Sequence, residues 1–107
     1  MIRIHLPVFR ATVFVYFGPK EFVQFNNFVV RSGENACNID DADGYTNAAR
    51  CWVKKPDDLT CLVHELFHVA NNIAQVCEIS DEECIAYILE YLYTKAAQRL
   101  EGVMGHI

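Results

Sequence analysis

The stretch from Leu59 to about Cys77 places the tightest constraint on this chain, because its spacing is typical of one amphipathic helix. At about 100° per residue, a single apolar face gathers Leu62, Leu66, Val69, Ile73 and Val76. His64 and His68 fall on the opposite side, one turn apart, so we expect them to line a cleft or face solvent. Two imidazoles in this relation can reach one zinc ion together.

The two histidines belong to the string His64-Glu65-Leu66-Phe67-His68, an H-E-x-x-H pattern. Glu65 would lie beside the metal, placed to take a proton from metal-activated water. The pattern therefore predicts zinc (Zn2+) as cofactor, His64 and His68 as two of its ligands, and Glu65 as a general base. The competing interpretation is an exposed helix face that carries two solvated histidines.

Composition excludes several classes of protein. With 107 residues, 52% hydrophobic and 21% charged, the sequence predicts one globular domain over residues 1–107. The net charge of −5 and the scattered Lys and Arg argue against a nucleic-acid partner, which requires clustered positive charge. No apolar run approaches the ~20 residues that cross a bilayer, so no membrane partner is expected. Five cysteines without paired spacing indicate reduced thiols and a cytoplasmic protein.

The segments before the motif predict strands and one further helix. Alternation over 2–6 and a β-branched, aromatic run over 11–17 predict two strands. Helical spacing predicts a helix over roughly 19–31, and the polar stretch 32–44 is typical of a loop. Ala48–Val53 predicts a third strand. The expected fold class is α+β, with a small antiparallel or mixed sheet of about three strands and three helices in the order β-β-α-β-α-α.

A last helix is expected from Ser80 to about Leu100, followed by a frayed tail over 102–107. Its apolar stripe would be Ile85, Leu89, Leu92 and Ala96. His106 in the tail and His5 in the first strand are poor candidates for ligands.

A zinc site with an open position for water uses three protein ligands, so one more donor is needed. Glu82 lies nearest the apolar stripe, where a metal would explain an otherwise unpaired carboxylate. Glu90 matches the level of His68 if the two helices form an antiparallel hairpin. Glu83 has a simpler alternative role, in a Ser80–Glu83 capping box.

Two cysteines offer another donor set. Cys77 and Cys84 could ligate zinc, but a thiolate-rich site tends to be structural and would leave Glu65 without a task.

Around the motif, Cys61 to Ala70 resembles the zincin metallopeptidases, because uncharged residues surround the H-E-x-x-H string and an apolar pair follows it. Cys61 stands where Val or Thr is more usual in that family. Most of the chain resembles small phage-encoded zincin-like proteins, which have a strand pair, a Trp-bearing strand, the motif helix and an acidic-start helix. The last of these reads E-x-x-A-Y, here Glu83-Cys84-Ile85-Ala86-Tyr87.

This resemblance implies a minimal zincin-like domain in which Glu83, the first Glu of that string, is the third zinc ligand. Fourteen residues separate His68 from Glu83, fewer than is usual for the class, whereas Glu90 falls nearer the familiar spacing. The resemblance also implies that Ala48–Val53 is an edge strand, to which an extended peptide adds by β-augmentation.

The sequence thus predicts a zinc-dependent metallopeptidase that hydrolyses a peptide bond in a peptide or protein substrate, such as a host protein in the host cytoplasm if the chain is phage-encoded. Tyr87 or Tyr91 would donate to the oxyanion. One alternative is a non-catalytic zincin-fold protein that binds a host factor. Another is a zinc site with a purely structural role.

Overall fold

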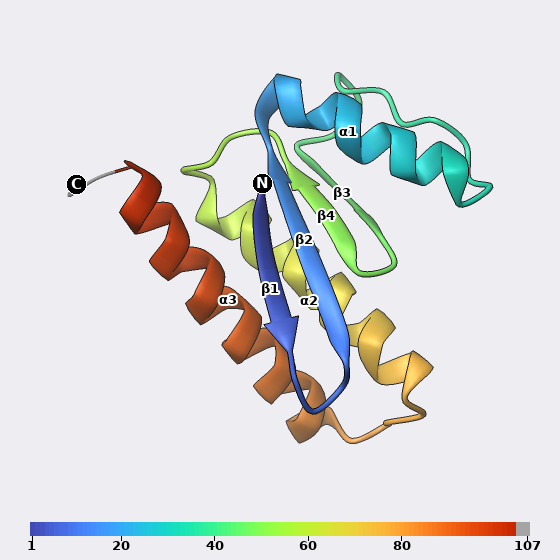
Figure 1. The fold of residues 1–107 in the computed structure, drawn as a ribbon, viewed down its shortest axis with the longest axis vertical. Helices are drawn as coiled ribbons and strands as arrows, with labels where there is room; N and C mark the ends of the chain where they lie inside the picture. Colours follow the sequence, from blue (N-terminus) through green and yellow to red (C-terminus); the bar gives the residue numbers. More distant parts are fainter. Residues whose placement is uncertain (105–107) are drawn as a thin grey trace.

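Residues 1–104, the part of the chain that this computed structural model describes, form a mixed four-stranded sheet with helices on both faces (Figure 1). In chain order the elements are β1 (Ile2–Leu6), β2 (Ala11–Phe17), α1 (Gly18–Arg31), β3 (Gly44–Asn47), β4 (Arg50–Val53), α2 (Leu59–Val76) and α3 (Glu82–Met104). The predicted α+β class is confirmed. The sheet has four strands rather than about three, so the order is β-β-α-β-β-α-α.

The strands lie in the order β1-β2-β4-β3. β1 pairs with β2 antiparallel, β2 with β4 parallel, and β3 with β4 antiparallel. The predicted strand Ala48–Val53 therefore consists of a turn and a strand. Ala48 and Ala49 form the turn between β3 and β4, and the remaining residues form β4. The prediction that it forms an edge is wrong, since β4 lies inside the sheet and β3 is at its edge.

Strand β3 was not predicted from the sequence. Its first residue, Gly44, falls at the end of the expected loop, and no element was expected over 45–47. Its sequence, Gly-Tyr-Thr-Asn, contains Gly and Asn, which are depleted in strands. It becomes a strand by pairing along its full length with β4, from Gly44 opposite Val53 to Asn47 opposite Arg50. A long-range pairing of this kind leaves no periodic signal in four residues.

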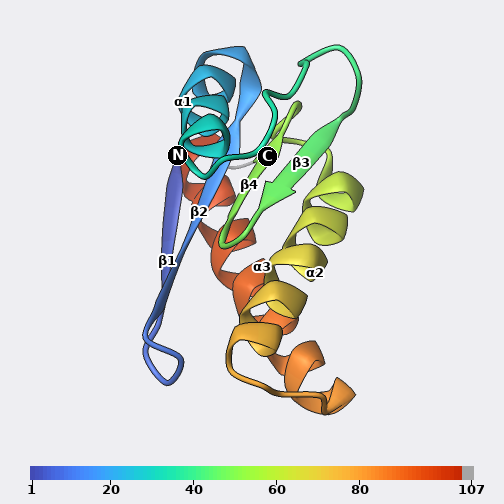
Figure 2. The same cartoon turned by 90° about the vertical axis from the view of Figure 1, so that its right-hand side faces the viewer.

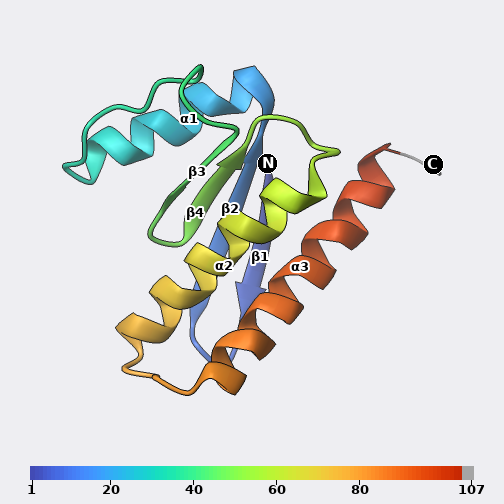
Figure 3. The same cartoon turned by 180° about the vertical axis from the view of Figure 1, so that it is seen from behind.

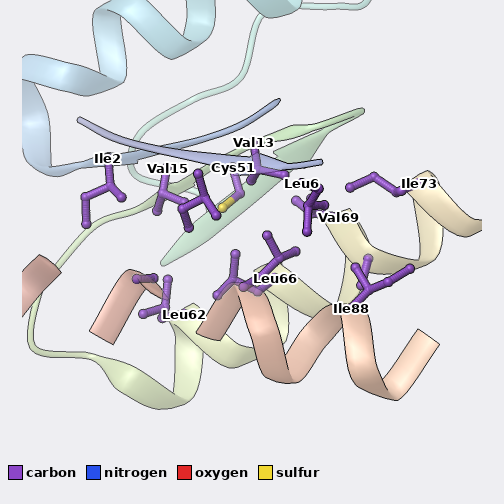
Figure 4. Packing of buried hydrophobic residues seen from close by; sticks show 14 of the residues in the cluster. Ile2, Leu6, Val13, Val15, Cys51, Leu62, Leu66, Val69, Ile73 and Ile88 are labelled. Atoms are coloured by element: carbon purple, nitrogen blue, oxygen red, sulfur yellow. The ribbon is translucent and has the colours of Figure 1, made fainter. Parts of the chain in front are cut away.

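Each face of the sheet carries its own apolar cluster. On one face α1 packs Phe22, Phe25 and Val29 against Tyr16 and Trp52. On the other face α2 and α3 lie side by side (Figure 3). Their buried residues interleave with those of the strands (Figure 4), and the larger members are Ile4, Val13, Val15, Leu62, Leu66, Val69 and Leu92.

The helix that carries the motif follows the prediction closely. Leu62, Leu66, Val69 and Ile73 of its expected apolar face are buried, whereas Val76 is 85% exposed at the last residue of α2. The helix begins after Asp58, whose side chain accepts a hydrogen bond from the backbone N–H of Cys61 at 3.0 Å. This contact satisfies one of the free donors at the helix start.

Helix α3 begins and ends later than predicted. It starts at Glu82, and Asp81 rather than Ser80 caps it, accepting from the backbone N–H of Glu83 at 2.9 Å. It continues to Met104, and residues 105–107, which include His106, lie outside the described part of the chain. Within residues 1–104, no helix combines the length and the apolar character that a membrane span requires.

The turn between β3 and β4 offers a test of this topology. Ala48 has φ 52°, a conformation that costs an L-residue energy and costs glycine none. We expect Ala48→Gly to raise the free energy of unfolding by about 0.5–1 kcal/mol, measured by urea denaturation. The matched control is Ala49→Gly, the other turn residue, whose φ is not positive. That change should lower stability by a similar amount, and equal effects of the two changes would contradict the turn.

Candidate functional site

The polar side of α2 and the edge strand β3 enclose an open groove of about 460 Å³. Figure 2 shows β3 as the outermost strand, running beside α2. The groove is lined by Gly44, Tyr45, Thr46, His64, Glu65, His68 and Asn72. All three chemically active residues of the H-E-x-x-H string therefore lie in one hollow.

The two histidines face each other at the mouth of the groove. Their Nε2 atoms are 3.2 Å apart, and the ring planes lie at 81° with centroids separated by 4.8 Å. The side chain of His64 is 66% exposed, so the pair is open to solvent and to small ions. Two imidazole nitrogens at this distance can share a hydrogen bond, or both can bind the same cation.

The spacing of the two nitrogens fits a tetrahedral zinc ion. Zn–N bonds of about 2.05 Å that end on atoms 3.2 Å apart enclose an angle of about 103° at the metal. An ideal tetrahedral angle is about 109°, so the rings need little adjustment to hold the ion. His64 and His68 therefore fit the cofactor that the motif predicts, as two of its ligands.

Glu65 occupies the floor of the groove. It is the one charged or polar residue among those described that is classed as buried, with 7% of its surface exposed. A buried carboxylate needs partners, and the hydroxyl of Thr46 donates to Glu65 Oε1 at 2.7 Å. The other oxygen, Oε2, lies 4.0 Å from His64 Nε2, on the side of the histidine pair. One oxygen is thus held by the sheet while the other lies toward the imidazole of His64.

Gly44 permits this close approach of strand and helix. A Cβ at this position would lie 2.7 Å from Cys61 Sγ, 2.9 Å from Glu65 Cγ and 3.0 Å from Glu65 Oε2. Any larger residue would push β3 away from α2 and separate Thr46 from Glu65. Gly44 is required here for the space that it leaves.

Two thiols lie behind Glu65. Burial, reinforced by the nearby Glu65 carboxylate, raises the pKa of Cys61 to about 11. The same two causes raise the pKa of Cys51, which is fully buried. In this environment both thiols stay protonated at neutral pH and pack as small apolar side chains do.

None of the residues predicted as a third zinc ligand lies in the groove. Within residues 1–104, no group of three or more His, Cys, Asp or Glu side chains is arranged to hold a metal ion. Glu83 is exposed in the first turn of α3, and Glu90 is exposed further along it. Glu82 lines a different hollow, between α2 and α3, beside Phe67. Cys77 and Cys84 line two further, separate hollows.

The topology explains the separation from α3. Helix α2 contacts β3 on one flank and α3 on the other, so a residue of α3 would have to reach past α2 (Figure 3). No α3 residue lines the groove.

The two tyrosines predicted as oxyanion donors also lie elsewhere. Tyr87 is 66% exposed and lines a hollow with Leu6 and Val8, at the turn between β1 and β2. The hydroxyl of Tyr91 donates to the carbonyl oxygen of His5 at 3.4 Å. Neither tyrosine lines the groove of the motif.

Sequence reasoning did not identify the other four residues that line the groove, which are Gly44, Tyr45, Thr46 and Asn72. Gly44 falls at the end of the expected loop and no element is predicted over 45–47, so no signal indicated that Thr46 lies beside Glu65. Asn72 carried a signal, since it continues the i, i+4 series of His64 and His68 on one helical face. Its side-chain Nδ2 donates to the carbonyl oxygen of Ala48 at 3.1 Å and so ties the β3–β4 turn to α2.

Removing the Thr46 hydroxyl tests this arrangement. We expect Thr46→Val to lower the free energy of unfolding by about 1.5–3 kcal/mol, because it leaves a buried carboxylate oxygen without its donor at nearly unchanged volume. Thr46→Ser is the control, since it keeps the hydroxyl and should cost about 1 kcal/mol or less. Urea denaturation measures both, and equal losses would show that the hydrogen bond contributes nothing.

Comparison with protein-family models, curated proteins and solved structures finds no match to this chain.

Proposed function

We propose that this protein is a zinc-dependent peptide hydrolase in which His64 and His68 bind the metal and Glu65 acts as the general base. The observation that carries the proposal is the 3.2 Å separation of the two Nε2 atoms beside a buried, hydrogen-bonded Glu65. Two solvated histidines on a helix surface need no buried carboxylate next to them, and burying a carboxylate is costly. Function explains that cost better than stability does.

Zinc, when bound, supplies a Lewis acid that polarises a peptide carbonyl and makes water a better nucleophile. The residues of the chain supply the rest. Glu65 receives the proton of the attacking water on Oε2, because Oε1 is engaged by Thr46. Thr46 positions the base by fixing the rotation of the carboxylate about its last side-chain bond.

Strand β3 offers the means to hold a peptide. It is the last strand of the sheet on the α2 side, so its outer edge presents backbone N–H and C=O groups above the groove. An extended peptide can add to such an edge through main-chain hydrogen bonds. We therefore propose Gly44–Asn47 as the substrate strand, in place of Ala48–Val53.

The sequence resemblance and the structure disagree about the third ligand. The resemblance implies Glu83, whereas Glu83 is exposed on α3 and outside the groove. The two histidines would then hold the ion with water in the remaining positions, one protein ligand fewer than the three that catalytic zinc sites use. We therefore base the proposal on the histidine pair.

Zinc content of purified variants tests the metal site. We expect about one zinc per chain in the wild type and almost none in His64→Ala or His68→Ala, because each removes half of the observed donor pair. His5→Ala, a histidine on β1 outside the groove, is the control. From the position of Glu83 we expect Glu83→Ala, like Glu82→Ala and Glu90→Ala, to retain zinc. Loss of zinc from Glu83→Ala alone would mean that α3 rearranges to bring this residue in.

Glu65→Gln tests the base. The amide keeps the shape of the side chain and its oxygen can still accept from Thr46, so zinc should stay bound. Hydrolysis of a quenched-fluorescence peptide library should fall by about 10²–10⁴-fold, because the amide cannot take a proton. Undiminished hydrolysis by this variant would remove Glu65 from the role of base.

A second candidate function is metal-independent binding of a partner strand at β3. It is favoured by the finding that the described residues place only two histidines, and no third donor of His, Cys, Asp or Glu, around a metal position. Chelation with EDTA distinguishes the candidates. Loss of hydrolysis with unchanged circular dichroism supports the hydrolase, and unfolding supports a structural zinc site. Undiminished partner binding without any hydrolysis supports the metal-independent binder.

A further inference from the structure

A second hollow lies beyond the site groove, at the end of the molecule where α2 finishes. Its volume is about 240 Å³, and its walls include Phe9, Ala48, Ala49, Ile73, Val76 and Cys77. The side chains that face it are mostly apolar, and Val76 is 85% exposed beside it. A hollow lined mainly by apolar side chains is the kind of site that takes up an apolar group.

The hollow and the site groove share one lining residue. Asn72 lines both spaces, and its hydrogen bond to Ala48 crosses the boundary between them. A molecule that lies along β3 over His64 and His68 therefore meets the apolar hollow when it passes Asn72. For that reason we refer to this hollow as the Asn72 pocket.

Backbone strain gathers around the same pocket. Among the described residues other than glycine, Arg10, Ala48 and Glu78 have positive φ. Arg10 and Ala48 line the pocket, and Glu78 directly follows Cys77, which also lines it. Such conformations cost energy and cluster where a binding site requires a particular wall shape.

We propose that the Asn72 pocket binds one apolar side chain of the peptide held on β3, on the N-terminal side of the bond that is cleaved. This inference rests on the proposed function and names the substrate preference of that site. The pocket is large enough for a Leu or Phe side chain, and apart from Arg10 and Asn72 the side chains that line it are apolar and offer dispersion contacts.

The register follows from the helix. Along α2, Asn72 lies one turn, about 6 Å, beyond His68. Two residues of an extended peptide span about 6.6 Å. A peptide that runs beside α2 therefore brings a side chain to the pocket two residues away from the residue over His68.

The direction of the peptide follows from pairing. A single strand added to an edge pairs more stably antiparallel than parallel. Strand β3 runs from Gly44 toward Ala48, so an antiparallel peptide enters over the Asn72 pocket and leaves over Gly44. The residue in the pocket therefore precedes the residues over the histidines.

The test separates binding from hydrolysis by using the intact Glu65→Gln protein, loaded with zinc. The probe is a degenerate dodecapeptide library without cysteine, captured by the protein and read by mass spectrometry. We expect enrichment of Phe, Leu, Ile or Val over Ser at one position by on the order of tenfold, the effect of burying one such side chain. Wild-type protein should cleave the selected peptides C-terminal to that position.

A pair of matched variants in the same background locates the preference. Val76→Glu places a charge on the wall of the pocket at an exposed position, and we expect it to abolish the enrichment. Val23→Glu makes the same change at a valine 60% exposed on α1, across the sheet, and should leave the enrichment intact. Bound peptide should also slow the alkylation of Cys77, which lines the pocket, and not that of Cys84, which lines another hollow.

The outcomes distinguish this inference from the proposed function. Capture of peptides without a preferred apolar position, or equal loss in Val76→Glu and Val23→Glu, overturns the pocket assignment and leaves the peptide groove in place. Failure of the protein to capture any peptide overturns both.

Discussion

The contact between β3 and α2 is the constraint on which the site depends. Gly44 lets the strand approach until no Cβ would fit, and Thr46 then reaches Glu65 at 2.7 Å. Because β3 lies so close to α2, the buried carboxylate has a hydrogen-bond donor. The same strand and helix form the walls of the groove. The other packing in the molecule, on both faces of the sheet, holds the strand and the helix at that separation.

The three motif residues differ in how far they are buried, and the difference suits the chemistry proposed for them. The histidine pair is open to solvent, where an ion can enter, while Glu65 is enclosed and fixed by a neutral hydroxyl. In the proposed function an enclosed base would keep its orientation, and an exposed ligand pair could exchange metal and accept a substrate. The thiols behind the carboxylate stay neutral because burial raises their pKa values, so they add no charge beside it.

Much of the fold could be predicted from the sequence, because most helices and strands show a periodic pattern within their own residues. The 3.6-residue spacing of Leu62, Leu66 and Val69 defined the motif helix nearly to its ends. Alternation over 2–6 defined β1, and a β-branched, aromatic run defined β2. The four residues of β3 had no such signal, since pairing with β4 and the space beside Glu65 create that strand. The role of Glu83 was inferred from the resemblance to zincins and that of Tyr87 from its place one turn beyond Glu83. Neither inference determines the flank of α2 on which α3 lies.

The sequence by itself determined the α+β class and the placing of His64, Glu65 and His68 on one helix, because helical periodicity brings residues one turn apart together in any fold. The tertiary structure decided everything that depends on neighbours from elsewhere in the chain. It selected β3 as the edge strand, gave Glu65 its partner in Thr46, set α3 on the far flank of α2, and made Asn72 a lining residue of both the groove and the apolar pocket. These relations join segments whose contact depends on the packing of the whole chain, and local spacing carries no information about them.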